Sequence, residues 1–237
     1  MVFVIGDIHG EYNKLVDLIT NILKKHLNPT LVFLGDYINK GTKSLEVLEY
    51  LSNLSSQIKC HFLWGNHEYS WFNLLNDTSH YKKYLSKYGG IATCNSFNTQ
   101  NVFEVYKILT SKYLNFFKSL QKYYIYKDYI ISHSGISEIN LDKDLEDIPL
   151  KDFLFNRYDF LNSSYCYKNF KFIFGHTGFY YPYVDEYKIG IDTGACYLPS
   201  QSLTSFCIDD NYFLNSHGDV TSLNYYKNLS KPSIIKL

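Results

Sequence analysis

Three stretches in the first third of the chain decide the fold: MVFVIGDIHG at 1–10, TLVFLGDYINKG at 30–41 and KCHFLWGNHE at 59–68. Each is a short apolar run that ends in a glycine followed by Asp or Asn, as expected of a buried strand that leaves a sheet. Apolar residues at helical spacing predict helices over 11–26 and 44–54 between these strands. The alternation predicts parallel strands with helical crossovers, and it puts the three loops on one edge of the sheet, where open α/β sheets bind ligands.

The rest of the chain predicts a second layer of sheet. Residues 70–122 are partly irregular and partly helical, and we expect them to form a helical insertion over the site. Short apolar stretches separated by turns predict further strands, antiparallel in the C-terminal third, over 123–131, 170–174, 188–191, 202–208 and 212–215. We therefore expect a single catalytic domain over 1–237, α/β in class and α+β in its C-terminal third. It should be a two-layered β-sheet sandwich flanked by helices.

Composition narrows the class of protein. The 237 residues carry 23 Lys plus Arg and 23 Asp plus Glu, and this balance argues against a strongly electrostatic nucleic-acid binder. No apolar run approaches the ~20 residues of a membrane-spanning helix, and the N-terminus has the pattern of a strand and not of a signal peptide. Five Cys without a CxxC pair favour reduced thiols. We expect a cytoplasmic protein with neither nucleic acid nor membrane as a partner.

Polar side chains with metal-binding chemistry follow the predicted strands. They comprise two carboxylates, one amide and four imidazoles: Asp7, His9, Asp36, Asn66, His67, His133 and His176. Mixed nitrogen and oxygen donors suit divalent metals of intermediate hardness. No thiolate is among them, which argues against a structural zinc site.

The motifs at 6–10, 35–41 and 65–68 resemble the three signature motifs of the calcineurin-like metallophosphoesterases. More narrowly, they resemble the branch of the serine/threonine phosphoprotein phosphatases that includes small bacterial and phage enzymes. The resemblance continues in order through SHSG, FNR, GHT and IDTGA, at 132–135, 155–157, 175–177 and 191–195, and spans residues 2 to about 210.

This resemblance implies a site for two divalent metal ions. Manganese is the metal that we expect first, and Fe, Zn, Ni or Co also fit the donors. The ions would lie ~3.5–4 Å apart, clamp a phosphate and activate a bridging water as hydroxide. The resemblance implies Asp7 and His9 as ligands of the first ion, Asp36 as the bridge, and Asn66, His133 and His176 as ligands of the second.

It also implies roles around the metals. His67 would be the general acid that protonates the leaving oxygen. Arg157, the only arginine of the chain, would bind two phosphate oxygens through its planar guanidinium. Lys40 and Asn66 are further expected contacts of the phosphate. Glu68, next to the acid, is expected to support its loop.

One departure from the family pattern affects the chemistry. Asn39-Lys40 stand where the family usually has Asp-Arg, and that aspartate normally orients the acid. Asn39 is expected to accept a hydrogen bond from His67 through its amide oxygen, without the charge that stabilises an imidazolium. Because a hydrogen bond to a charged partner contributes ~1.5–3 kcal/mol, slower turnover of poor leaving groups follows. Lys40 keeps the positive charge but not the bidentate geometry.

Three functions remain open from the sequence. The leading hypothesis is a phosphoric monoester hydrolase that acts on phosphoserine or phosphothreonine proteins. The first alternative is a symmetrical dinucleoside tetraphosphate hydrolase, because enzymes of that kind resemble this branch and also lack the aspartate. The second alternative is a degenerate domain that binds a phosphorylated ligand without turnover. The expected partner is thus a phosphorylated protein or a small phosphate ester.

Overall fold

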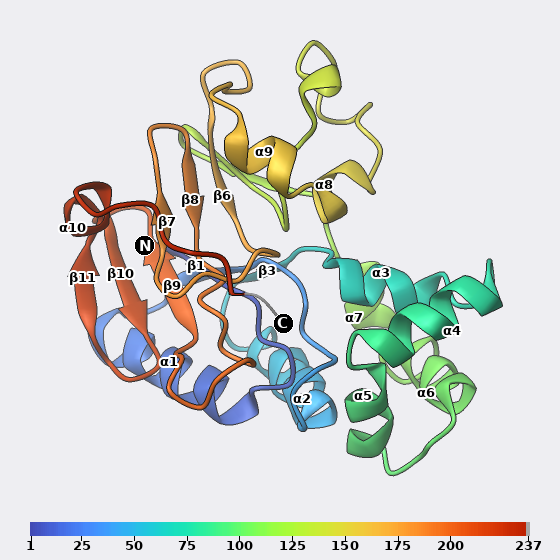
Figure 1. Ribbon diagram of the computed structural model, residues 1–237. Coiled ribbons are helices and arrows are strands. Elements are labelled where there is room, and N and C mark those ends of the chain that lie inside the picture. The colour runs from blue at the N-terminus through green and yellow to red at the C-terminus, as the bar shows by residue number, and fades with distance from the viewer. Residues whose placement is uncertain (236–237) are drawn as a thin grey trace.

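The computed structural model describes residues 1–235 as two β-sheets flanked by helices (Figure 1). The N-terminal part of the chain contributes three strands to the first sheet, β1 (Val2–Ile5), β2 (Thr30–Phe33) and β3 (Cys60–Phe62). Helices α1 (Tyr12–Lys25) and α2 (Ser44–Leu54) connect these strands. Three later strands complete the sheet: β9 (Thr204–Cys207), β10 (Tyr212–Asn215) and β11 (Val220–Ser222). The short helix α10 (Leu223–Lys227) follows β11. The strand order is β11-β10-β9-β1-β2-β3, with β1, β2 and β3 parallel, as the sequence predicts.

The second sheet has the strand order β4-β5-β6-β8-β7. Its strands are β4 (Tyr124–Tyr126), β5 (Tyr129–Ile131), β6 (Lys171–Phe174), β7 (Tyr183–Val184) and β8 (Lys188–Gly190). The connection from β5 to β6 contains η1 (Glu138–Asn140), α8 (Asp152–Phe155) and α9 (Tyr158–Asn162). The antiparallel prediction for 188–191 is confirmed on one side of β8, which pairs antiparallel with β7, and is wrong on the other side, where β8 runs parallel to β6. The chain reverses direction between the edge strand β7 and β8, which are antiparallel to each other, so β8 runs in the same direction as β6.

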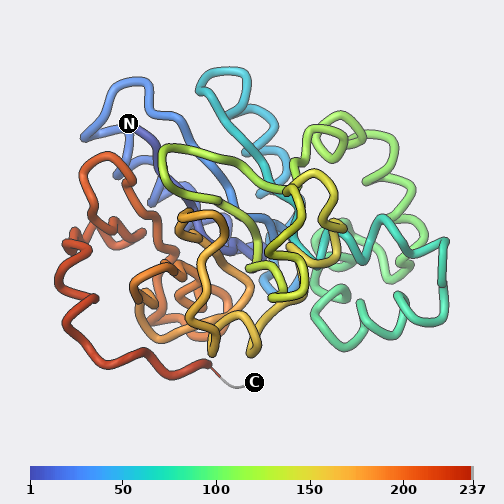
Figure 2. The backbone as a smooth tube through the Cα atoms, turned by 90° about the horizontal axis from the view of Figure 1, so that it is seen from above, coloured from blue at the N-terminus to red at the C-terminus, as the bar shows by residue number. Residues whose placement is uncertain are grey.

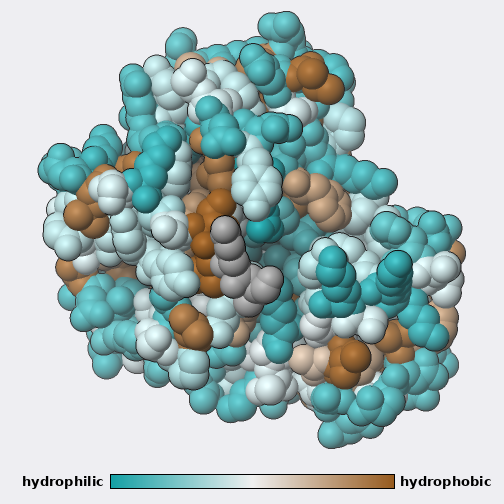
Figure 3. All heavy atoms as spheres, viewed as in Figure 1, coloured by the Kyte–Doolittle hydropathy of each residue, from teal (hydrophilic) through white to brown (hydrophobic). Residues whose placement is uncertain are grey.

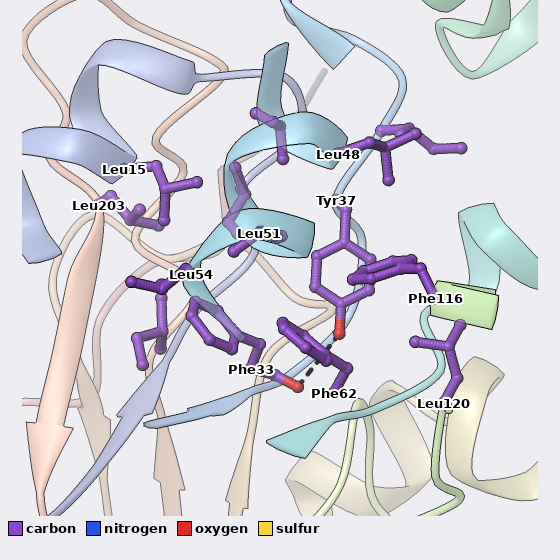
Figure 4. Packing of buried hydrophobic residues seen from close by; sticks show 14 of the residues in the cluster. Leu15, Phe33, Tyr37, Leu48, Leu51, Leu54, Phe62, Phe116, Leu120 and Leu203 are labelled. Carbon is purple, nitrogen blue, oxygen red and sulfur yellow. Dashed lines mark hydrogen bonds between the residues drawn. The ribbon is translucent and has the colours of Figure 1, made fainter. Parts of the chain in front are cut away.

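The predicted helical insertion is present and lies beside the two sheets (Figures 1 and 2). It consists of α3 (Asn66–Phe72), α4 (Thr78–Lys87), α5 (Gly90–Ser96), α6 (Val102–Leu109) and α7 (Leu114–Lys118). Phe116 of α7 ties it to the first sheet, because its ring lies 5.4 Å from that of Tyr37 and 4.8 Å from that of Phe62 (Figure 4). The insertion is therefore anchored next to the loop that carries Asp36.

Side-chain alternation along β1 separates two hydrophobic cores. Phe3 and Ile5 pack toward the helices, whereas Val2 and Val4 pack toward the second sheet. Successive strand residues point to opposite faces, so a four-residue strand buried on both sides serves both cores. Within residues 1–235, no helix has the length and apolar character of a membrane span, and all five cysteines are free thiols.

Candidate metal centre

The predicted ligands meet where the two sheets adjoin. Asp7 and His9 follow β1, Asp36 follows β2, and Asn66 opens α3 directly after β3 and its short loop. His133 and His176 follow β5 and β6 of the second sheet. The first four side chains thus come from one sheet and the last two from the other, so neither sheet alone holds the complete set.

The backbone is in the left-handed region at several of these positions. Its φ is +47° at His9, +52° at Asp36 and +64° at His176, and Asn39 and Lys40 share the feature at +71° and +63°. Non-glycine residues adopt such angles only where the surroundings hold them, and such residues cluster at functional sites. The loops are therefore held in shape by contacts outside the ligand set.

Glu68 supplies the most direct of these contacts. Its carboxylate is fully buried and accepts hydrogen bonds from the backbone N–H of Asp36, Tyr37 and Ile38, at 2.8, 2.9 and 3.3 Å. Burial, and then the charge of Asp36, raise the pKa of Glu68 to about 8, while the backbone donors oppose the rise. Glu68 supports a loop as expected, but it is the loop after β2 that carries Asp36 and not the loop next to His67.

The half of the site around His133 has the donor chemistry of a cation site. His133 Nδ1 lies 3.0 Å from Leu34 O, and because a carbonyl only accepts, Nδ1 carries the proton. The lone pair of His133 Nε2 therefore faces Asn66 Oδ1 at 2.7 Å and Asp36 Oδ1 at 3.5 Å. His176 Nδ1 lies 2.9 Å from the same Asn66 oxygen. Two imidazole nitrogens, an amide oxygen and a carboxylate oxygen gathered at these distances are a donor set that suits a divalent cation.

The half around His9 repeats this arrangement. His9 Nδ1 donates to Ile38 O at 3.0 Å, so its Nε2 presents a lone pair 3.3 Å from Asp36 Oδ2. Asp7 Oδ1 is buried and has no hydrogen-bond partner among residues 1–235. Burial, Asp192 and Asp36 raise the pKa of Asp7 well above its usual range. A cation would relieve this cost, because it favours the ionised carboxylate.

Asp36 belongs to both halves. Two groups of side chains have ligand atoms that all lie within 4.8 Å of one another, namely His9 with Asp36 and His67, and Asp7 with Asp36 and His133. Burial raises the pKa of Asp36, but His133, His67 and His9 outweigh it and hold that pKa well below its usual range. Asp36 is common to both groups, whereas Asp7 groups with His133 and not with His9, its partner in the ligand set that the resemblance implies. The bridging role of Asp36 stays a prediction.

Asn39 contacts His67, but its hydrogen bond runs opposite to the prediction. Asn39 Oδ1 accepts from Trp71 Nε1 at 2.9 Å and from Thr93 Oγ1 at 2.8 Å. Since an indole N–H only donates, the amide oxygen must face Trp71, and Asn39 Nδ2 donates to His67 Nδ1 at 2.7 Å. The proton of neutral His67 is thereby placed on Nε2, on the side of Asp36 Oδ2 at 3.7 Å.

The environment of His67 favours its neutral form. Burial lowers the pKa of His67 well below its usual range, although Asp36 raises it. The prediction that Asn39 accepts from the imidazole is wrong, because Trp71 and Thr93 already occupy both lone pairs of the amide oxygen.

The two predicted phosphate-binding cations lie on opposite sides of the site. Lys40 Nζ donates to His9 Nε2 at 2.9 Å and to Tyr197 OH at 2.8 Å. Arg157 Nη2 donates to His176 O at 3.0 Å. Both side chains line a pocket of about 530 Å³ that also contains Asp36 and His67. Figure 3 shows a hydrophilic hollow between the insertion and the body of the molecule.

Tyr84 is a residue of the site that the sequence does not predict. It lies on α4 of the insertion, lines the same pocket and accepts a hydrogen bond from Asn66 Nδ2 at 2.5 Å. In this arrangement Asn66 Oδ1 faces His133 and His176. No motif marks Tyr84, which is one of 24 tyrosines, and only the packing of α4 on α3 brings it to the site.

Comparison with protein families gives one match across most of the chain. The sequence model of the calcineurin-like phosphoesterase family matches residues 1–211.

Curated relatives match shorter segments. A zinc-dependent endopolyphosphatase of Saccharomyces cerevisiae is 42% identical over 65 residues, which are 27% of this chain and 19% of that protein. A symmetrical bis(5'-nucleosyl)-tetraphosphatase of Buchnera aphidicola is 37% identical over 81 residues, or 34% and 28% of the two chains. The catalytic subunit A2 of the yeast serine/threonine-protein phosphatase 2B is 39% identical over 101 residues, or 40% and 16%. The matches thus span less than a third of each relative.

Solved structures share the fold over nearly the whole chain. A putative diadenosine tetraphosphatase is 17% identical, with 93% of this chain and 91% of that chain covered and a TM-score of 0.61. The cold-active protein-tyrosine phosphatase of a Shewanella species is 16% identical, with 94% and 80% covered and a TM-score of 0.68.

Tyr84→Phe should weaken metal binding, because Asn66 loses the partner that orients its amide. Loss of an orienting partner typically lowers metal affinity about 10- to 100-fold. Titration calorimetry with Mn²⁺ measures the change without relying on activity. Tyr106→Phe, elsewhere in the insertion, is the matched control and should bind Mn²⁺ like the parent protein. Equal affinities for the parent and Tyr84→Phe would contradict the orienting role.

Glu68→Ala should lower the free energy of unfolding by about 3 kcal/mol or more, because three buried backbone N–H groups lose their acceptor. Urea denaturation of the metal-free protein measures this loss. Glu46→Ala removes an exposed carboxylate of α2 and should leave stability within about 0.5 kcal/mol. A Glu68→Ala protein as stable as the Glu46→Ala control would show that the loop is held by other contacts.

Proposed function

The chain belongs to the calcineurin-like phosphoesterase family and is a hydrolase, and from this premise we propose that it cleaves phosphate substrates at a centre of two divalent metal ions. The donor sets described above support the proposal. Asp7, His9 and Asp36 would hold one ion, and Asp36, Asn66, His133 and His176 the other. Bound there, divalent ions would neutralise phosphate oxygens and activate the attacking water. Manganese as the native metal and the cytoplasm as the location stay predictions.

The chain's own residues would bind the phosphate from two sides. Arg157 and Lys40 both line the pocket and carry the positive charges that a phosphate needs. Anchoring of Arg157 on His176 O leaves its remaining N–H groups for the substrate. His67 would present its Nε2 proton to the leaving oxygen, as a hydrogen-bond donor in its neutral form.

The direction of the hydrogen bond from Asn39 to His67 carries our choice of substrate. The donated amide N–H occupies the Nδ1 lone pair, so His67 cannot become an imidazolium without two N–H groups facing each other. A neutral imidazole stabilises a leaving anion but is a poor proton donor. The site therefore favours leaving groups that are stable as anions, and phosphoanhydrides release such groups.

We accordingly place a nucleoside polyphosphate first, hydrolysed with water to two nucleoside diphosphates in the symmetrical case. The similarity to symmetrical bis(5'-nucleosyl)-tetraphosphatases supports this choice. This reverses the order expected from the sequence alone. A phosphoprotein remains the second candidate, because a protein phosphatase 2B subunit is 39% identical over the longest segment among these relatives. Membership of a hydrolase family and the full set of donors argue against a degenerate binding domain.

A competition in one tube separates the two substrates. Protein loaded with Mn²⁺ receives diadenosine tetraphosphate and a phosphoserine peptide together, and mass spectrometry follows both. We expect release of ADP that EDTA abolishes, with much slower loss of phosphate from the peptide. Dephosphorylation of the peptide with the dinucleotide intact would reject the nucleotide proposal and favour the phosphoprotein.

Asn39→Asp should raise turnover of an alkyl phosphate monoester about 10-fold or more, because a carboxylate accepts from His67 and stabilises the imidazolium. The aspartate has the size of asparagine and keeps the bonds from Trp71 and Thr93. Turnover of the anhydride should change little. The measurement is the ratio of kcat for phosphoserine and for diadenosine tetraphosphate. An unchanged ratio would disprove our account of Asn39.

Asp36→Asn should abolish binding of both metal ions, because Asp36 contributes to both donor sets. Binding of Mn²⁺ to the folded state raises the melting temperature by mass action. We expect the shift in the parent protein and in Asp17→Asn, an exposed control on α1, and none in Asp36→Asn. Two ions bound per Asp36→Asn chain, counted by calorimetry, would refute the bridging assignment.

A further inference from the structure

Aromatic side chains form much of the wall of the active-site pocket. They come from three separate segments: Tyr84 and Tyr88 from the insertion, Phe155 and Tyr158 from α8 and α9, and Tyr197 from the loop after β8. Three of them are also exposed, Tyr88 at 39%, Phe155 at 41% and Tyr158 at 62% of their surface. Large exposed apolar groups gathered around one pocket are characteristic of a binding site.

On each side of the pocket, an aromatic ring lies close in the fold to one of the two cations that we propose bind phosphate. On one side, Phe155 ends α8, Tyr158 begins α9, and Arg157 lies between the two helices. On the other side, Tyr88 directly follows α4, and the next residue, Gly89, accepts a hydrogen bond from Lys40 N at 3.2 Å through its backbone carbonyl. The pocket therefore combines a charged floor with rings at its rim.

The rings differ in how far their faces are already occupied. Tyr88 stands 4.6 Å from the ring of Tyr84 and has Lys87 Nζ 4.9 Å from its centre. Phe155 makes an edge contact with Tyr69 at 5.9 Å. Tyr158 has neither an aromatic nor a cationic partner among residues 1–235, although it is the most exposed of the three. Its face is thus free for a ligand.

We propose that Tyr158, assisted by Phe155 and Tyr88, is a subsite that stacks the nucleobase of a nucleotide whose phosphates lie on Arg157 and Lys40. A base–aromatic stack tolerates any base and suits a residue that offers a flat face beside a cation. A pocket of about 530 Å³ is in the range of small-molecule sites. This inference rests on the proposed function and assigns the residues that would recognise the organic part of its substrate.

Binding of products tests the subsite without requiring turnover. Calorimetry on the Mn²⁺-loaded protein gives the Kd of ADP and of pyrophosphate, and their ratio reports what the adenosine moiety contributes. We expect Tyr158→Ala to weaken ADP about 10-fold and pyrophosphate less than about 2-fold. Phe155→Ala should act in the same direction, and Tyr158→Phe should retain most of the adenosine contribution, because it keeps the ring.

Tyr225→Ala is the matched control, since this tyrosine of α10 is 55% exposed and does not line the pocket. An equal loss of ADP and pyrophosphate affinity in Tyr158→Ala would overturn the subsite, as would no loss at all. If Tyr158→Ala lost affinity for a phosphotyrosine peptide but not for ADP, the nucleobase would be rejected as the ligand of the rings, and an aryl phosphate would take its place. If ADP binding responds as expected while the dinucleotide is not hydrolysed, the proposed function fails and the subsite stands.

Discussion

Asp36 is a buried carboxylate that faces three imidazoles, and the other parts of the site are arranged around it. Its oxygens lie 3.3, 3.7 and 3.5 Å from nitrogens of His9, His67 and His133. A charge buried this deeply is tolerable only if it is paired, and a cation held by the surrounding donors would supply the partner. The left-handed backbone at Asp36, held by Glu68, fixes where that group lies.

The insertion does more than cover this centre. Trp71 and Thr93 fix the amide of Asn39, and Tyr84 fixes the amide of Asn66. Two side-chain amides, whose oxygen and nitrogen ends are nearly equal in shape, thereby acquire a defined orientation. The hydrogen-bond character of His67 and of a predicted metal ligand is thus set by residues outside the two sheets.

The same division appears in substrate recognition. In the proposed function, the loops after the strands supply the metal ligands and Lys40, and the segment from α8 to α9 adds Arg157 as a second contact of the phosphate. The insertion and the segment from α8 to α9 also supply the exposed rings, which we propose contact the part that differs between substrates. Selectivity can then change through loops and helices while the charged centre is kept, because functional variation is carried by segments mounted on a rigid scaffold.

The sequence by itself determined the parallel strands, the helical insertion and the residues that gather at the strand ends. These follow from local periodicity and from glycines next to Asp, Asn and His, which are visible in the order of residues. Only the tertiary structure decided the direction of the hydrogen bond from Asn39 to His67, the contact of Tyr84 with Asn66, and the parallel course of β8. Each depends on partners far apart in the chain, such as Trp71 with Asn39 or β8 with β6. Periodicity along the sequence does not encode which distant donor reaches a given acceptor.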